Sequence, residues 1–314
     1  MSKTFVVTGC NGYIGSHMCY ELRKTYPDCI IHGIDKHEKQ HLRSLYDFYH
    51  NTDLVSDTIN LPARADAIFH FAAYTSVEES MREPFMYHQN NLVGSIRLID
   101  RAIVERAENF IFSSTAAVYG ESHDSMFGHL NENRPMNALS VYGHTKQVVE
   151  EILASVYQMN VMCLRYFNAC GRNVEAGLYE EHDPETHLIP LLARSKTATI
   201  YGNDWPTRDG TCIRDYVHVI DICKAHLLSY KHMSGMAMRT NDVLNVGSGK
   251  GYTVKEIVDK ANEIIHNGEM TIEYKERREG DVAYLVANTD KIKMMLNFTP
   301  QYTLDDILES MKNG

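Results

Sequence analysis

The first fifteen residues place the strongest constraint on the fold. Residues 5–8 are a short apolar, β-branched run typical of a buried strand, and Gly9, Gly12 and Gly15 follow before a helical pattern begins near Ser16. A strand, a glycine-rich turn and a helix in this order are typical of pyrophosphate-binding turns, where the helix N-terminus presents its N–H groups to the phosphates. An ordinary glycine-rich turn is the alternative, because such spacing also occurs outside binding sites.

An acidic residue ends the second apolar run. Residues 30–35 close with Asp35, roughly twenty positions beyond the glycine turn. In dinucleotide-binding folds, a carboxylate at this place contacts the adenosine ribose hydroxyls and repels a 2′-phosphate. Asp35 therefore favours NAD over NADP, and the neighbouring Lys36 and His37 weaken that preference without reversing it. The alternative is that Asp35 only caps the end of the strand.

Strand and helix patterns alternate through the first half of the chain and loosen afterwards. Strands are predicted at 67–73, 109–115, 161–168, 197–202, 216–219, 242–246 and 270–274, and helices at 90–104, 141–157 and 221–231. Alternation of this kind predicts an α/β fold, with helices on both faces of a doubly wound, parallel, Rossmann-type sheet. We expect an NAD-binding domain over 1–168, with returning segments near 212–248. A smaller, interleaved C-terminal lobe, mainly 169–314, would bind the substrate.

Composition excludes several classes of partner. The net charge of −10, from 31 basic and 41 acidic residues, argues against nucleic acid or an anionic membrane as the main partner. No apolar stretch has membrane-spanning length, and residues 1–3 lead directly into a strand, so no signal peptide is expected. The seven cysteines are scattered without a CxxC pair, which predicts a reduced, cytoplasmic protein. The chain has 16 histidines, and we predict no metal.

Tyr142 and Lys146 lie four residues apart and so share one face of a predicted helix. A tyrosine with its ordinary pKa of about 10 is a poor base at neutral pH. A nearby ammonium, together with the positive charge of oxidised nicotinamide, would lower that pKa. Thr115, at the end of the preceding predicted strand, could hydrogen-bond the same substrate hydroxyl. Helices carry such pairs by chance, but the glycine turn and Asp35 favour the catalytic interpretation.

Six segments together resemble a known family. They are the glycine turn at 9–15, the Ser-Ser-Thr-Ala-Ala-Val-Tyr-Gly segment at 113–120, the YxxxK pair, and the segments 165–168, 201–219 and 277–281. The chain resembles the extended short-chain dehydrogenases/reductases over nearly its whole length. Within that family it is most similar to the 4-epimerases of UDP-glucose and UDP-galactose.

The resemblance implies an isomerase of galactose metabolism and gives three residues a role in the reaction. Tyr142 would remove the proton of the sugar 4-hydroxyl, Lys146 would hold the nicotinamide ribose, and Thr115 would orient the hydroxyl. The reaction would pass through a transient 4-keto sugar. NAD would be regenerated in each cycle and stay tightly bound, the UDP-sugar would be the substrate, and the protein would be a homodimer.

The resemblance also implies two sets of contact residues. The cofactor-binding set is Gly9, Gly12, Tyr13, Ile14, Gly15, Asp35, Asp57, Phe71, Ala72, Ala73, Asn91, Tyr142, Lys146 and Tyr166. The substrate-binding set is Thr115, Asn168, His187, Leu188, Tyr201, Arg214, Arg278, Asp281 and Leu285. Arg214 and Arg278 would pair with the diphosphate, because guanidinium groups match phosphate oxygens. Ordinary salt bridging is the alternative for both arginines.

Three positions depart from the pattern of the 4-epimerases or of their relatives. Thr75 stands where many of these epimerases carry a cofactor-contacting lysine, and His187 replaces a common asparagine. Ala116 and Ala117 stand where the related 4,6-dehydratases carry an Asp-Glu pair. Alanines have no proton to give or take, so elimination of water is not expected.

Leu285 bears on the sugar that would be accepted. It aligns with a residue beside the sugar 2-substituent, where a tyrosine would exclude an N-acetyl group by its bulk. Leucine is smaller, so a UDP-N-acetylglucosamine 4-epimerase, or an enzyme that accepts both sugars, is an alternative. A catalytically silent NAD-binding protein is a further alternative, against which the retained Thr115, Tyr142 and Lys146 argue.

Overall fold

The computed structural model describes residues 2–120, 128–181, 185–236, 239–278 and 280–312. The chain forms two compact units, each built from several segments. The first unit comprises Met1–Val118, Met136–Arg165 and Cys223–Leu244. The second comprises Tyr119–Pro135, Tyr166–Ile222 and Asn245–Gly314. The chain therefore passes between the units several times.

A seven-stranded sheet is the main feature of the fold, and its strand order is β10-β6-β5-β4-β1-β2-β3. The bounds are β1 (Thr4–Thr8), β2 (Ile30–Asp35), β3 (Phe48–Asn51), β4 (Ala67–His70), β5 (Asn109–Thr115), β6 (Asn160–Tyr166) and β10 (Asn241–Val246). β1 pairs in parallel with both β2 and β4, so the strand order turns in opposite directions on either side of β1. This confirms the predicted doubly wound, Rossmann-type α/β fold, in which ligands bind near such a switch point.

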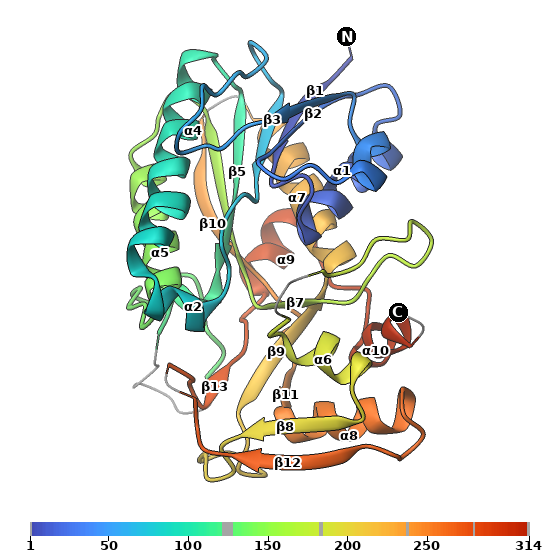
Figure 1. Ribbon diagram of the computed structural model, residues 1–314. Coiled ribbons are helices and arrows are strands. Elements are labelled where there is room, and N and C mark those ends of the chain that lie inside the picture. Colours follow the sequence, from blue (N-terminus) through green and yellow to red (C-terminus); the bar gives the residue numbers. More distant parts are fainter. Residues whose placement is uncertain (1, 121–127, 182–184, 237–238, 279, 313–314) are drawn as a thin grey trace. The chain divides into compact units, whose positions relative to one another are not determined.

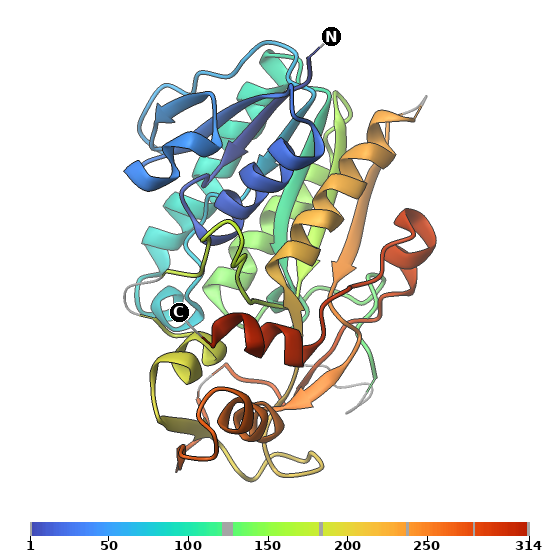
Figure 2. The ribbon, with the colours of Figure 1, turned by 90° about the vertical axis from the view of Figure 1, so that its right-hand side faces the viewer.

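Helices cover both faces of this sheet (Figures 1 and 2). α1 (Tyr13–Thr25) and α7 (Val219–Ser234) lie on one face, and α4 (Gly94–Val104) and α5 (Val141–Ala154) lie on the other. Apolar side chains of the strands and of α4 and α5 form one buried cluster, which includes Val6, Ile68, Leu98, Phe110 and Val149. Burial of these side chains fixes which face of each helix meets the sheet.

The second unit contains two smaller sheets. In one, β9 (Ile213–His218) pairs in parallel with β7 (Asn168–Cys170) and β13 (Tyr284–Leu285), and antiparallel with β11 (Gly251–Thr253). In the other, β8 (Thr197–Tyr201) pairs in parallel with β12 (Thr271–Lys275). Helices α6 (Leu188–Arg194), α8 (Val254–Ile264) and α10 (Leu304–Met311) contribute to a core that includes Leu192, Ile200, Ile257 and Leu308. α9 (Asp290–Leu296) completes the unit.

Some boundaries differ from the prediction. β4 ends at His70 and β6 at Tyr166, so 71–73 and 167 leave the sheet earlier than their apolar character predicted. The pattern at 90–104 is realised as a π-helical turn (η2, His88–Val93) followed by α4. The sequence missed β3, β11 and β13, and also η1 (Gln40–Leu45), α2 (Val77–Arg82), α3 (Pro84–Tyr87), η3 (Ala116–Val118) and α6. These elements are short, and their burial depends on neighbours distant in sequence rather than on a local apolar pattern.

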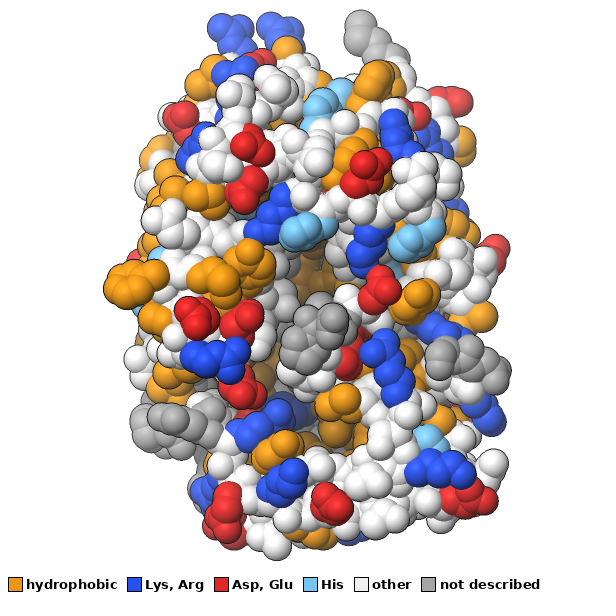
Figure 3. All heavy atoms as spheres, viewed as in Figure 1, with side chains coloured by type: hydrophobic (Ala, Val, Ile, Leu, Met, Phe, Trp, Pro, Cys, Tyr) orange, Lys and Arg blue, Asp and Glu red, His pale blue; other side chains and the backbone are white. Residues whose placement is uncertain are grey.

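On the face drawn in Figure 3, acidic and basic side chains are interspersed, and neither sign forms a continuous stripe. No helix among the described residues is both long and apolar enough to cross a membrane.

Candidate active site

The glycine turn adopts a geometry that leaves no room for side chains. Gly9 has a φ of +68°, and a Cβ there would lie 2.8 Å from the backbone nitrogen of Ala72. A Cβ on Gly15 would lie 2.0 Å from the carbonyl oxygen of Gly9. Gly12 is the N-cap residue of α1 and makes no side-chain capping bond, so the helix begins without a side chain over its N-terminus. This cradle fits the pyrophosphate of a dinucleotide, and the predicted contact residues Tyr13 and Ile14 are the first residues of the helix.

Asp35 joins the end of β2 to the glycine turn. One carboxylate oxygen accepts a hydrogen bond from the Asn11 backbone N–H at 3.0 Å, and the other accepts one from the His37 backbone N–H at 3.0 Å. Asp35 therefore caps the strand end, as its alternative role predicts. Each carboxylate oxygen has a second lone pair, so the same geometry also suits contact with ribose hydroxyls.

The structure brings Thr115, Tyr142 and Lys146 together. Thr115 ends β5, and Tyr142 and Lys146 lie on successive turns of α5, which starts at Val141 after the capping residue Ser140. Tyr142 is hydrogen-bonded with Thr115. The Lys146 ammonium donates to the carbonyl oxygen of Ser113 at 2.8 Å.

Burial dominates the ionisation of this group. It raises the pKa of Tyr142 to about 12, and the hydrogen bond with Thr115 opposes the rise. Burial also lowers the pKa of Lys146 to about 7, and the charge of Glu150 opposes that fall. The prediction of a lowered tyrosine pKa is wrong for the polypeptide itself, because desolvation of the phenolate outweighs the stabilising interactions. Lys146 is consequently a cation that can lose its proton near neutral pH.

In the second unit, Arg214, Arg278 and Asp281 form a charged cluster beside Tyr201. Asp281 lies 3.2 Å from Arg214 Nη2 and 3.5 Å from Arg278 Nε, and the Arg278 guanidinium lies 4.4 Å from the centre of the Tyr201 ring. Two guanidinium groups share one carboxylate, which leaves an excess of positive charge suited to a diphosphate. Leu285 lies next to this cluster, because it pairs with Arg214 in the register of β13 and β9. Of the predicted motif at 277–281, Glu279 lies outside the described residues.

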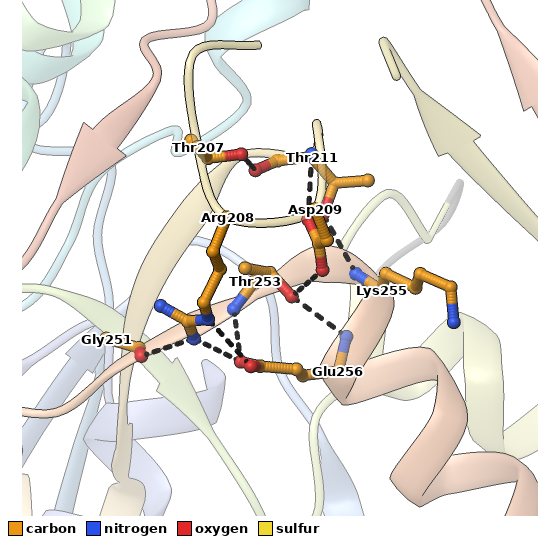
Figure 4. Close-up of polar contacts among 8 residues, drawn as sticks. All are labelled: Thr207, Arg208, Asp209, Thr211, Gly251, Thr253, Lys255 and Glu256. Carbon is orange, nitrogen blue, oxygen red and sulfur yellow. Dashed lines mark hydrogen bonds and ion pairs between the residues drawn. The ribbon is translucent and has the colours of Figure 1, made fainter. Parts of the chain in front are cut away.

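A polar network holds the segment that leads into β9 (Figure 4). The Arg208 guanidinium donates to both carboxylate oxygens of Glu256, which also takes part in the capping box of α8 with Thr253. Asp209 accepts from the backbone N–H of Thr211 at 2.9 Å and from the hydroxyl of Thr253. These bonds attach the turn to the first turn of α8, and β9 with Arg214 follows immediately.

Asp215, adjacent to Arg214, is fully buried and accepts hydrogen bonds from three backbone N–H groups. The donors are Ser248 at 2.7 Å, Gly249 at 3.0 Å and Ala287 at 3.1 Å. Burial raises the pKa of Asp215 to about 6 despite these donors. The carboxylate thus connects β9 to the 247–249 turn and to the segment after β13, which fixes the backbone that carries Arg214.

His187, the residue before α6, forms an ion cluster with two glutamates. Its Nδ1 lies 3.0 Å from Oε1 of Glu180 and 3.0 Å from Oε1 of Glu185. Burial lowers the pKa of His187, but the hydrogen bonds with the two carboxylates outweigh it and raise the pKa to about 10. The three side chains are also close enough to hold a metal ion. A protonated imidazole already supplies the cation that two neighbouring carboxylates require.

Comparison with known proteins identifies the family. The model of the family described as GDP-mannose 4,6 dehydratase matches residues 6–311. The chain belongs to this family. Membership confirms the predicted resemblance to the extended short-chain dehydrogenases/reductases.

Curated relatives and solved structures agree on the fold over the full length. A UDP-glucose 4-epimerase of Rhizobium leguminosarum bv. trifolii is 36% identical, with 98% of this chain and 96% of that protein covered. One of Rhizobium meliloti (strain 1021) is 37% identical, with 99% and 97% covered. The structure of the Stenotrophomonas maltophila UDP-glucose-4-epimerase with bound NAD and formylated UDP-arabinopyranose has a TM-score of 0.87 at 28% identity, covering 99% of this chain and 97% of that chain. The UDP-Glc/GlcNAc 4-epimerase of Campylobacter jejuni has a TM-score of 0.80 at 31% identity, covering 99% and 98%.

The dehydratase in the family description does not fit the residues after β5. Ala116 and Ala117 form the short turn η3, in which the Ala117 backbone N–H donates to the Thr115 hydroxyl at 3.1 Å. A Cβ on Gly143 would lie 2.7 Å from the Ala117 carbonyl oxygen, so α5 packs closely on this turn. The turn supplies no side chain that could donate or accept the protons of a dehydration. Within the family, these residues favour a reaction without loss of water.

Lys36 contacts the residue before Thr75, one of the positions that depart from the 4-epimerase pattern. Thr75 itself is exposed. The Lys36 ammonium donates to the Tyr74 hydroxyl at 2.6 Å and to the Asn90 side-chain oxygen at 3.1 Å, and it lies 4.4 Å from the centre of the Tyr74 ring. A cation from the end of β2 therefore reaches the residue next to Thr75. In the sequence, Lys36 is notable only as a neighbour of Asp35, and its contact with Tyr74 depends on the fold.

Other predicted cofactor contacts serve local structure. The buried Asn91 side chain accepts from the Tyr74 backbone N–H at 2.8 Å and donates to its carbonyl at 2.9 Å, so it holds the loop after β4. That loop carries Phe71, Ala72 and Ala73. The exposed Asp57 accepts from the Asp53 backbone N–H at 2.8 Å, within its own turn.

Two further predicted contact residues, one polar and one aromatic, lie at the ends of strands. Asn168 begins β7 and donates to the Asp215 carbonyl at 2.8 Å, across to β9. Tyr166 ends β6 and is almost fully buried. Leu188, the first residue of α6, directly follows His187.

Proposed function

We propose that this chain is an NAD-dependent UDP-sugar 4-epimerase, an isomerase that interconverts UDP-glucose and UDP-galactose through a transient 4-keto sugar. The observation that carries the proposal is the grouping of Thr115, Tyr142 and Lys146 beside two alanines, a site that has an acid–base residue but no second proton donor for dehydration. Two relatives that match over nearly their full length, both UDP-glucose 4-epimerases, support it.

The residues of the first unit account for the proton transfer. Tyr142, ionised as the phenolate that the Lys146 ammonium stabilises, accepts the proton of the sugar 4-hydroxyl and becomes the neutral phenol, while Thr115 orients the sugar hydroxyl. The glycine turn and Asp35 would hold NAD, which would supply hydride exchange with carbon 4 of the sugar. The proton returns from Tyr142, so substrate and product differ only in configuration and no net oxidation occurs.

The second unit would hold the nucleotide. Arg214 and Arg278 suit the two phosphates of UDP, because both guanidinium groups share a single carboxylate partner, Asp281. Tyr201 offers an aromatic face in the same cluster. Holding the diphosphate away from the reacting carbon allows the 4-keto sugar to turn while the nucleotide stays bound.

We also propose that the enzyme is a cytoplasmic homodimer. All seven cysteines are buried and free, which suits a reducing compartment. On α2–α4, the side chains of Met81, Phe85 and Ile96 are exposed, and their apolar character suits contact with a second copy. Sedimentation of the purified protein at micromolar concentration should give twice the monomer mass, and a monomer would contradict the dimer.

A second sugar is favoured by one residue. Leu285 pairs with Arg214 in the register of β13 and β9, and leucine leaves more volume than tyrosine for a 2-N-acetyl group. The similarity to the UDP-Glc/GlcNAc 4-epimerase of Campylobacter jejuni is compatible with dual specificity. Turnover of UDP-N-acetylglucosamine, lost in Leu285→Tyr but kept in Leu285→Met, would support this, whereas an inactive wild type with this substrate ends it.

The proposed activity is tested with the purified protein, UDP-galactose and no added NAD. UDP-glucose should form, and Tyr142→Phe should lower its formation by about 10²–10⁴-fold, the usual contribution of acid–base catalysis. Tyr157→Phe is the matched control, since Tyr157 is an exposed tyrosine, 78% accessible, just beyond the end of α5. Absence of product from both UDP-galactose and UDP-N-acetylgalactosamine, even with NAD supplied, would contradict the proposal and favour a silent binding protein.

A further inference from the structure

Lys146 is a buried cation in an environment that disfavours its charge. The side chain is 3% exposed, and its ammonium donates to the Ser113 carbonyl and lies 4.8 Å from the centre of the Phe112 ring. A carbonyl and an aromatic face are weak compensation for the loss of water around an ammonium. Another group must therefore supply negative charge if Lys146 is to stay protonated near neutral pH.

Glu150 is that group, one helical turn further along α5. Its position four residues after Lys146 places both side chains on the same face of the helix. Glu150 is 5% exposed, and its negative charge opposes the fall in the pKa of Lys146 caused by burial. An uncompensated buried carboxylate would be costly, so Glu150 also requires partners of its own.

Two strands of the sheet contribute those partners. Arg165 of β6 donates from Nη2 to Oε2 at 2.7 Å and from Nε to Oε1 at 3.0 Å, and the hydroxyl of Ser114 on β5 also donates to Oε1. Arg165 and Ser114 are themselves buried. The carboxylate is thus fixed from the sheet, one helical turn after Lys146 along α5.

Among the described residues, the elements around α5 carry several other titratable groups. His70 of β4 is neutral, since burial and Lys146 lower its pKa to about 3, and burial raises the pKa of the Cys163 thiol of β6 far above its usual range. On η2, His88 packs against His144 of α5. Beyond these, α2 carries Glu78, Glu79 and Arg82, of which Glu79 accepts from the Tyr87 hydroxyl of α3, while η3 is apolar and Asp242 of β10 acts on Cys163.

We propose that Glu150, fixed by Arg165 and Ser114, is a positioning residue that keeps Lys146 protonated through the catalytic cycle. This inference rests on the proposed epimerase function. It differs from a purely structural salt bridge between Glu150 and Arg165, because a structural role predicts loss of stability at every pH, whereas the positioning role predicts a changed dependence on pH.

The decisive variant is Glu150→Gln, which keeps the size of the side chain and removes its charge. The high-pH fall in kcat, caused by deprotonation of Lys146, should move about one pH unit lower, a roughly tenfold loss above both midpoints with little loss at pH 5. Glu151→Gln is the matched control, because Glu151 is exposed and its carboxylate accepts from Gln147 at 2.9 Å. An unchanged midpoint, or an equal loss at all pH values, would overturn the inference.

A second variant covers the case in which Glu150→Gln does not fold. The double variant Glu150→Gln/Arg165→Met removes both charges of the buried pair, a replacement that proteins often tolerate. Its high-pH midpoint should lie below that of the wild type. A midpoint equal to that of the wild type would contradict the role of Glu150.

The protonation state of Lys146 can also be measured by NMR, without an activity assay. With ¹³C-labelled lysine, the Cε resonance of Lys146, assigned by its absence in Lys146→Met, should titrate at lower pH in Glu150→Gln than in the wild type. If the wild type does not epimerise UDP-sugars but this shift is found, the proposed function fails and the role of Glu150 stands. If the wild type epimerises and the resonance titrates unchanged, only the role of Glu150 fails.

Discussion

In the first unit the functional cation, Lys146, lies within a helix and is only 3% exposed, whereas in the second unit the side chain of Arg278 is 51% exposed and stacks on Tyr201. The buried cation can lose its proton, because desolvation shifts a lysine easily, while a guanidinium stays charged in almost any environment. The difference matches two tasks. The charge of a lysine beside the proton-transferring tyrosine can be tuned by its neighbours, whereas an arginine that binds phosphates keeps a permanent charge.

The sharpest way to break this comparison is to remove the buried cation. Lys146→Met replaces the ammonium by an apolar chain of similar length in an apolar site, so the fold should be retained. We expect kcat to fall by about 10²–10⁴-fold, since the phenolate of Tyr142 loses its stabilising charge. The measurement is the rate of UDP-glucose formation together with circular dichroism.

The control for this variant is Lys293→Met, at an exposed position of α9. A Lys146→Met enzyme that keeps more than about a tenth of the wild-type rate would show that acid–base catalysis at this site does not depend on the lysine.

The exposed cation should behave differently. Arg278→Ala removes one of the two guanidinium groups beside Asp281, and hydrogen bonds to a charged group contribute about 1.5–3 kcal/mol. We therefore expect KM for the UDP-sugar to rise by about 10–100-fold, with a smaller change in kcat.

Arg277→Ala is a close control for Arg278→Ala. Arg277 is the preceding residue, but its guanidinium stacks on Trp205 and its Nε donates to Asp204 at 2.7 Å. Its removal should leave KM nearly unchanged. Equal effects of the two substitutions would mean that general surface charge, rather than a specific contact, attracts the substrate.

The same contrast explains what could be predicted from the sequence. Tyr142 and Lys146 are neighbours because helical geometry makes them so, and the glycine turn and Asp35 follow one strand-turn-helix unit. The pairing of Arg214 with Asp281 joins residues 67 positions apart, and only the register of β9 and β13 brings them together. The sequence therefore identifies the arginines through a family resemblance and not through their spacing.

Glu150, Arg165 and Asp215 show why the remaining groups were missed. Each is a charged residue inside an apolar pattern, which is a weak sign of burial, but their partners come from other strands and turns. The edge strand β3 was missed for a related reason. Its four residues, Phe48–Asn51, are at least partly exposed, so it lacks the apolar run by which the inner strands were recognised.

The ion cluster of His187 provides the smallest and last test, because it combines a titratable cation with partial exposure. The folded pKa of about 10 lies above the ordinary value of about 6.5, so the stabilisation is complete below pH 6.5 and is lost as the pH rises through 10. The side chain is 42% exposed, and water screens its charge, so we expect no more than about 1 kcal/mol. In thermal unfolding, the Tm difference between the wild type and His187→Asn should shrink by roughly 2 °C between pH 6 and pH 10.5. A difference that stays constant would mean a neutral imidazole.

Treatment with EDTA should leave the unfolding curves unchanged if the imidazolium, rather than a metal ion, balances Glu180 and Glu185. A fall in Tm on chelation would instead assign a metal cation to this cluster.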